Sequence, residues 1–154
     1  MQVFVPYRTP IKCAMSLDMR RLNKQIIECR QILAAIRGEV SAWRNHPCVK
    51  MYAGHTDWLE DYTLCLEAVY INRHVKTEDI AAEDALEEAE LWSRMAESLT
   101  PDFLTEEFCI QHRRRLYTKD NDTYERFAKY GESEENWYFV DGELWKYVNG
   151  KRIA

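Results

Sequence analysis

The stretch LDMRRLNKQIIECRQIL, residues 17–33, decides the fold of this chain. Its apolar residues recur at alternating spacings of three and four, the period with which one face of an α-helix meets a core. Ser16 can cap such a helix, and Gly38 can end it in the left-handed conformation that glycine tolerates. The sequence therefore predicts a helix from Ser16 to about Arg37, with the core stripe Met19, Leu22, Ile26, Cys29, Leu33 and Ile36.

A polar stripe lies beside this apolar face on the same predicted helix. It presents two cations, an amide and a carboxylate: Arg21, Lys24, Gln25 and Glu28. One interpretation is a surface ladder of ion pairs at helical spacing. The other starts from the chain's first residues, MQVFVPY, from which we expect no leader to be removed. A free α-amine near a helix-borne glutamate suffices for imine-forming chemistry on a sugar carbon, without a metal or cofactor.

Length and composition indicate one soluble domain, residues 1–154. A chain of 154 residues buries about 70% of its unfolded surface around a single core. No apolar run approaches the roughly 20 residues of a membrane span, and the N-terminus lacks the charged and apolar regions of a signal peptide. We expect a cytoplasmic monomer that does not bind membranes.

Cysteine usage favours a reduced protein without a structural metal. The five cysteines are odd in number, widely spaced and embedded in apolar helical patterns, so they indicate core thiols rather than disulfides. The four histidines do not pair with them at zinc-ligand spacing. We therefore expect no metal and no cofactor.

The net charge of −5 is unevenly distributed along the chain. Residues 78–107 contain eleven acidic residues and a single base, Arg94, so the remainder of the chain carries a net +5. Two interpretations are open: a solvated acidic helix on a mixed surface, or a basic face opposite that helix.

The remaining layout is helical up to Gly131. Pro47 suits a first helical position, and Gly54 suits a break. The caps and breakers predict a turn over Val40 to His46, helical segments from Pro47 to about His74 and from Thr77 to about Ser98, a new start at Thr100 and Pro101, and helices over Thr105 to about Thr118 and Thr123 to Tyr130.

The pattern changes after Gly131, where the fold is expected to end in an aromatic β-meander over residues 136–153. Asp141-Gly142 and Asn149-Gly150 favour the tight turns that join twisted strands, so they predict two consecutive hairpins. Alternation places Trp137, Phe139 and Leu144 on one side, and Tyr138, Trp145 and Tyr147 on the other. Either the helices cover these aromatics or a ligand stacks on them.

Four stretches of the chain resemble the pyrimidine-dimer DNA glycosylases of the phage endonuclease V type and their bacterial relatives. The stretches are MQVFVPY, LDMRRLNKQIIECRQIL, WRNHPCVKMYAGHTDWLEDY and QHRRRL. The resemblance implies a mainly helical fold of the endonuclease V type, in which the N-terminal amine inserts between helices beside a catalytic glutamate. That glutamate aligns with Glu28, and Arg21 takes the place of a side chain that contacts substrate.

The implied activity is that of a DNA glycosylase with associated AP lyase activity. Because Gln2 is large and protects Met1 from trimming, the amine would be that of Met1, and it would attack C1′ of a damaged nucleotide to form an imine. Glu28 would stabilise the positive sugar and then handle the 2′ proton. The expected contacts to phosphates and to the displaced nucleotide are Arg21, Lys24, Gln25, Arg44, His55, His112 and Arg113.

Other interpretations remain open at this point. The scaffold could bind a nucleotide or nucleic acid without catalysis, or act on the glycosidic bond of free nucleotides or hypermodified bases. His55 could be a helix-start histidine bonded to backbone. One arginine of the run after His112 could pair with Glu106 or Glu107. Trp43 and Trp58 are expected to be core anchors.

Overall fold

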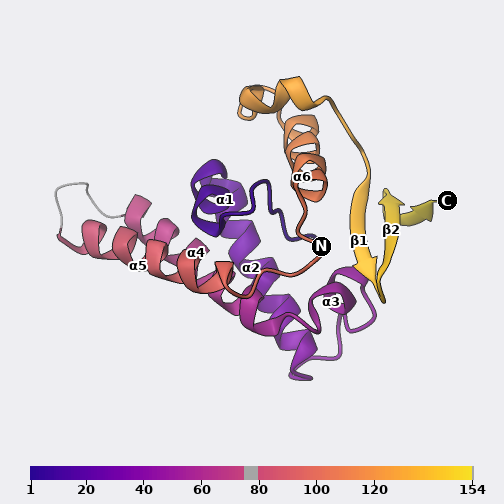
Figure 1. Ribbon diagram of the computed structural model, residues 1–154, viewed down its shortest axis with the longest axis horizontal. Helices are drawn as coiled ribbons and strands as arrows, with labels where there is room; N and C mark the ends of the chain where they lie inside the picture. The colour runs from indigo at the N-terminus through magenta and orange to yellow at the C-terminus, as the bar shows by residue number, and fades with distance from the viewer. Residues whose placement is uncertain (75–79, 154) are drawn as a thin grey trace.

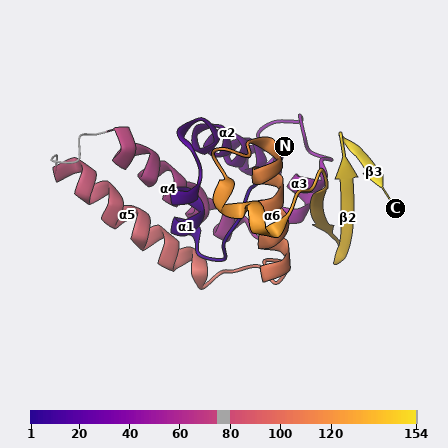
Figure 2. The same cartoon turned by 90° about the horizontal axis from the view of Figure 1, so that it is seen from above.

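The computed structural model describes residues 1–74 and 80–153. It is mainly helical and ends in a small antiparallel sheet, so the predicted fold class is confirmed (Figures 1 and 2). One buried apolar cluster includes residues of the N-terminal segment, the helices and the first strand. The elements are α1 Pro10–Ser16, α2 Met19–Ile36, α3 Pro47–Tyr52, α4 Thr56–His74, α5 Ile80–Glu97, α6 Glu106–Lys119, a 3₁₀ helix Glu125–Tyr130, β1 Asn136–Val140, β2 Glu143–Val148 and β3 Lys151–Ile153.

The start of α2 differs from the sequence prediction. Ser16 belongs to the separate short helix α1, and Asp18 caps α2 by accepting a hydrogen bond from the Arg21 N–H at 3.4 Å. The two helices are distinct because Leu17 and Asp18 adopt extended backbone conformations. The predicted end is confirmed, since Gly38 has a φ of +73° just beyond α2.

The next two helices follow the predicted breakers. Pro47 occupies the first turn of α3, and the His46 Nδ1 accepts the Cys48 N–H at 3.0 Å as its cap. The break near Gly54 is confirmed, because α4 begins only at Thr56. Trp58 is 1% exposed and anchors the core as expected. The same expectation is wrong for Trp43, whose side chain is 53% exposed in the loop before α3.

The acidic helix α5 packs on α4 and also contacts α1. Alanines such as Ala85 and Ala89 face the core, whereas Glu87 and Glu88 are exposed. This division explains how a strongly acidic segment forms a packed helix. Its predicted start at Thr77 lies outside the described residues.

Helix α6 confirms the predicted helix over Thr105 to about Thr118, whereas the separate start predicted at Thr100 and Pro101 is wrong. The stretch from 100 to 105 is irregular, and the Thr105 hydroxyl caps α6 by accepting the Phe108 N–H at 3.2 Å. Helical structure before Gly131 is confirmed, as a 3₁₀ helix that ends at a glycine with a φ of +87°.

The predicted β-meander is confirmed, with strand order β1-β2-β3. Both residues of each turn, Asp141-Gly142 and Asn149-Gly150, have positive φ, as hairpin turns of the mirror-image type require. The β1–β2 register pairs Tyr138 with Trp145 and Phe139 with Leu144, which confirms the predicted faces. The sheet packs on α3 and α6, and Tyr138 is buried.

All five cysteines are buried and unpaired, which confirms the prediction of reduced core thiols. Burial raises the pKa of the Cys48, Cys65 and Cys109 thiols to about 12. Within residues 1–74 and 80–153, the helices are too short or too polar to cross a membrane.

Candidate active site at the N-terminus

The N-terminal segment, residues 1–9, runs without helix or strand between α2 and α6 and bends over residues 6–9 (Figure 1). Buried side chains on these helices bond to its backbone. The Gln25 Oε1 accepts the Phe4 N–H at 2.6 Å, and the Gln25 Nε2 donates to the Gln2 carbonyl at 3.0 Å. On the other side, the His112 Nδ1 accepts the Val5 N–H at 2.6 Å. The position of residue 1 is thus fixed from two helices.

His112 is neutral in this environment. Burial, reinforced by the nearby Arg115 charge, lowers the pKa of His112 to about 3. Because Nδ1 accepts a hydrogen bond, the ring proton of this neutral histidine lies on Nε2; the Gln2 Nε2, 3.4 Å away, is also a donor and makes no hydrogen bond with it.

Glu28 lies beside the first peptide bond of the chain. Its carboxylate accepts the Gln2 N–H at 3.2 Å and is 3.8 Å from the Lys24 ammonium. The carboxylate is largely sheltered, with 17% of the side chain exposed. The Tyr138 hydroxyl of β1 donates to the Met1 carbonyl at 2.9 Å, so the sheet also holds the terminus.

Glu28, Lys24 and the first two residues of the chain line a pocket of about 120 Å³ between the N-terminal segment, α2, α6 and the start of β1. Four of its side chains are cationic and one is anionic. Desolvation, followed by repulsion from neighbouring cations that include Arg115, lowers the pKa of Lys119. The pocket therefore has the electrostatics of an anion site. Its lining residues are Met1, Gln2, Phe4, Arg21, Lys24, Gln25, Glu28, Arg115, Lys119 and Asn136.

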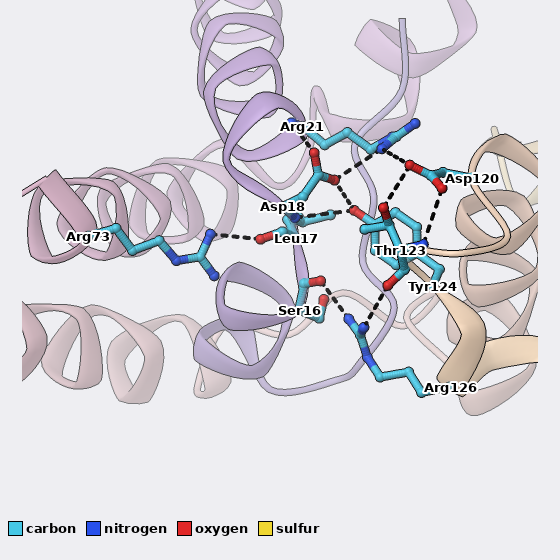
Figure 3. A network of polar contacts seen from close by, with 9 residues as sticks. All are labelled: Ser16, Leu17, Asp18, Arg21, Arg73, Asp120, Thr123, Tyr124 and Arg126. Carbon is cyan, nitrogen blue, oxygen red and sulfur yellow. Dashed lines mark hydrogen bonds and ion pairs between the residues drawn. The ribbon is translucent and has the colours of Figure 1, made fainter.

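Arg21 is held by a polar network that joins the start of α2 to the segment after α6 (Figure 3). Its guanidinium lies 3.1 Å from Asp18 and 3.7 Å from Asp120. Tyr124 donates a short hydrogen bond to the Asp18 carboxylate. Although partial burial opposes it, hydrogen bonds from Tyr124 and Arg21 lower the pKa of Asp18. The carboxylate is therefore charged at neutral pH and orients Arg21.

Arg115 is positioned by the chain that leads into β1. Its Nε donates to the Asn136 side chain at 2.8 Å, and one terminal nitrogen donates to the Ser133 carbonyl at 3.1 Å. Only 10% of the side chain is exposed. Lys119 lies one helical turn further along α6 and reaches the same pocket.

The structure brings together five of the residues singled out from the sequence and leaves four apart. Met1, Arg21, Lys24, Gln25 and Glu28 line the pocket, with Gln25 buried against the N-terminal segment. Arg44, His55, His112 and Arg113 do not line it.

Each of the four has a different setting. Arg44 is exposed in the loop before α3. His55 precedes α4, with its ring 5.3 Å from that of Phe103. His112 lies buried beneath the N-terminal segment. Arg113 is also buried; its Nε donates to the Pro6 carbonyl at 2.6 Å, and its guanidinium pairs with Glu106.

Sequence reasoning missed Arg115, Lys119 and Asn136. The spacing of four between Arg115 and Lys119 was available as a signal, because it puts both cations on one face of a helix. Arg115 was not singled out because it belongs to a run of three arginines, and consecutive residues lie on different faces of a helix. Within the described residues, no cluster of three or more metal-ligating side chains occurs.

Comparison with known proteins identifies the first half of the chain. A family model described as pyrimidine dimer DNA glycosylase matches residues 1–82, which include the N-terminal segment, α2, α3 and α4. Among curated proteins and solved structures, nothing matches the chain.

Proposed function

Because the chain belongs to the pyrimidine dimer DNA glycosylase family, we propose that its reaction begins at the α-amine of Met1, with Glu28 as the acid–base partner. The observation that carries this proposal is the 3.2 Å hydrogen bond from the Gln2 N–H to Glu28, because that amide is joined directly to residue 1. A nucleophilic amine and a carboxylate would then face the same small space.

The proposed first step is displacement at C1′ of the target deoxyribose. The neutral amine forms a C1′–N bond as the bond between C1′ and the base breaks, and the departing base takes up a proton. The attacking amine must be neutral, because only the unprotonated nitrogen has a lone pair to donate. Glu28 stabilises the positive charge that develops on the sugar.

The proposed second step is strand cleavage. After the sugar ring opens to the imine, Glu28 removes the 2′ proton and the C3′–O3′ bond breaks by β-elimination, which releases the downstream strand with a 5′ phosphate and leaves the unsaturated sugar imine on the upstream strand. Water then hydrolyses the imine and regenerates the free amine. Each bond made has a matching bond broken, and no metal or redox partner takes part.

We assign the four pocket cations to the backbone phosphates that flank the target nucleotide. Arg21 is held by Asp18 and Arg115 by Asn136, so their guanidinium groups need little ordering on binding. Lys24 and Lys119 add mobile charge at the mouth. Within the proposal, His112 and Arg113 act indirectly, by holding the N-terminal segment.

A polynucleotide substrate suits this pocket better than a free nucleotide does. Pockets that enclose a free small ligand usually have volumes of about 300–1,000 Å³, and this one has about 120 Å³. A sugar or a phosphate fits such a space, while the rest of the substrate lies outside it. The surrounding cations then contact phosphates along a strand.

The test is borohydride trapping of tag-free protein, whose terminus is verified by mass, on ultraviolet-irradiated, abasic-site and undamaged duplexes. We expect an adduct at residue 1 with irradiated and abasic DNA and none with undamaged DNA. Glu28→Gln should keep DNA binding and slow turnover about 10²- to 10⁴-fold, the usual contribution of acid–base catalysis.

The matched control is Glu67→Gln on α4, because Glu67 also pairs with a base of α2, namely Arg30, but lies outside the pocket. It should react like the wild type. An adduct that maps to Lys24 rather than to residue 1, or an unchanged rate in Glu28→Gln, would contradict the proposed mechanism. If an adduct forms with abasic DNA but not with irradiated DNA, the protein is a lyase without glycosylase activity on that damage.

A further inference from the structure

Trp43 is exposed in the loop between α2 and α3. Of its side chain, 53% is accessible to solvent. Its backbone φ is +66°, in the left-handed region that bulky side chains seldom adopt, and its carbonyl accepts the His46 N–H at 2.8 Å. The loop therefore holds a large aromatic ring outward in a conformation that core packing does not explain.

A series of aromatic rings links this exposed indole to the first residue of the chain. The Trp43 and His46 ring centroids are 6.0 Å apart, and those of His46 and Tyr138 are 5.6 Å apart, both in edge-to-face geometry. The Tyr138 hydroxyl in turn bonds to the Met1 carbonyl. Burial, and then the charge of the terminal amine, lower the pKa of His46, which agrees with this closeness.

The chemistry around the ring suits a nucleic acid. Arg44 follows Trp43 and is also exposed, and Met1, to which Tyr138 bonds, lines the cationic pocket. An exposed aromatic beside cations offers a base a face for stacking and the adjoining phosphate a partner. No acidic side chain interrupts the loop between Trp43 and His46.

We propose that Trp43 stacks on a base of the DNA next to the target nucleotide and occupies the space that opens when a nucleotide leaves the duplex. Its edge contact with His46 sets the ring at a fixed position relative to residue 1, and Arg44 contacts the phosphate beside it. This inference rests on the proposed function, because it takes a duplex opened at the pocket as the ligand. It adds a stacking residue outside the pocket itself.

The test measures binding to a duplex with a tetrahydrofuran abasic analogue, which cannot form an imine, and with 2-aminopurine opposite it. We expect Trp43→Ala to weaken binding roughly 5-fold or more, the typical loss when one stacked base loses its aromatic partner. The rise in 2-aminopurine fluorescence that reports unstacking should also disappear. Trp43→Phe should retain most of both signals.

Two further variants separate stacking from a structural role. Leu91→Ala on α5 removes an apolar side chain of similar exposure, 46%, and should behave like the wild type. Trp43→Gly relieves the left-handed backbone, so it should unfold at a temperature no lower than the wild type while binding as weakly as Trp43→Ala. Weak binding accompanied by a lower unfolding temperature in both Trp43 variants would overturn the inference.

The inference and the proposed function fail in different ways. If wild-type protein forms the residue 1 adduct but Trp43→Ala binds and unstacks the duplex like the wild type, the inference is overturned and the imine mechanism stands. If Trp43→Ala loses binding while the wild type forms no adduct, the inference stands and the mechanism fails. Wild-type protein that does not bind the duplex would overturn the inference as well.

Discussion

At the scale of single residues, buried polar side chains hold the N-terminal segment in the site. Gln25 and His112 each bond to its backbone, at Phe4 and Val5, from opposite helices. An unsatisfied backbone amide in a buried setting would cost about 1–3 kcal/mol, so these contacts strongly favour one position of the segment. Gln25 and His112 thus hold the N-terminal segment in position.

His112 makes the stability of the protein depend on pH. Its pKa is about 3 in the folded protein and about 6.5 in an unfolded chain, so between these values the unfolded state binds more protons. The contribution of neutral His112 to the free energy of unfolding is fully present above pH 6.5 and decreases as the pH falls towards 3. We expect a loss of about 1.4 kcal/mol for each pH unit between about 6 and 4.

Urea unfolding of the wild type and His112→Gln at several pH values measures this loss. The difference between their free energies of unfolding should shrink as the pH falls. His74→Gln, which changes an exposed histidine at the end of α4, should keep the wild-type dependence. If the free energy of unfolding depends on pH equally in the wild type and in His112→Gln, then protonation of His112 is not coupled to unfolding.

At the scale of elements, the segment after α6 determines how Arg21 is presented on α2. Asp120 and Tyr124 come from that segment, and both belong to the network around Asp18 and Arg21 (Figure 3). Tyr124 is fully buried, so its hydroxyl has no ready replacement partner. The orientation of a cation in the first half of the chain therefore depends on the second half.

Tyr124→Phe should loosen this connection without removing the ring. Loss of a hydrogen bond to a carboxylate is expected to lower the free energy of unfolding by about 1–2 kcal/mol. It should also weaken binding to abasic DNA, because Arg21 loses part of its fixed setting. Urea unfolding and fluorescence anisotropy measure the two effects.

Tyr130→Phe is the matched control, since the Tyr130 hydroxyl makes no hydrogen bond within the described residues. It should bind DNA like the wild type. If Tyr124→Phe loses stability but keeps full DNA affinity, the network has only a structural role.

At the scale of the whole molecule, the most acidic segment and the cationic pocket belong to different elements. The acidic helix α5 packs on α4 and α1, whereas the cationic pocket lies between α2 and α6. A chain with a net charge of −5 can therefore offer a positive site to a phosphate backbone. The overall charge is a poor guide to the partner in such a case.

Salt dependence tests this separation directly. Lys119→Ala should reduce the slope of log affinity against log salt for abasic duplex by about one, because one phosphate contact is lost. Arg94→Ala removes a cation from the acidic helix and should leave the slope unchanged. If the slope of log affinity against log salt is the same for Lys119→Ala and the wild type, Lys119 does not contact a phosphate.

The sequence by itself determined the elements whose signals are local. Helical periodicity, Pro47, the glycines and the two hairpin turns depend on neighbours in the chain, so most helices and the meander could be predicted from them. Local signals were insufficient to locate the start of helix α2. Ser16 was the predicted cap, but the extended backbone at Leu17 and Asp18 separates α1 from α2 and makes Asp18 the cap.

Only the tertiary structure decided which residues share the site. Periodicity placed Glu28 on a helix face, but the closeness of Gln2 to that face results from folding of the N-terminal segment between α2 and α6. The same holds for Arg115 and Asn136, which reach the pocket from distant parts of the chain. Exposure of Trp43 was equally beyond the sequence, because burial depends on what packs around a side chain rather than on its type.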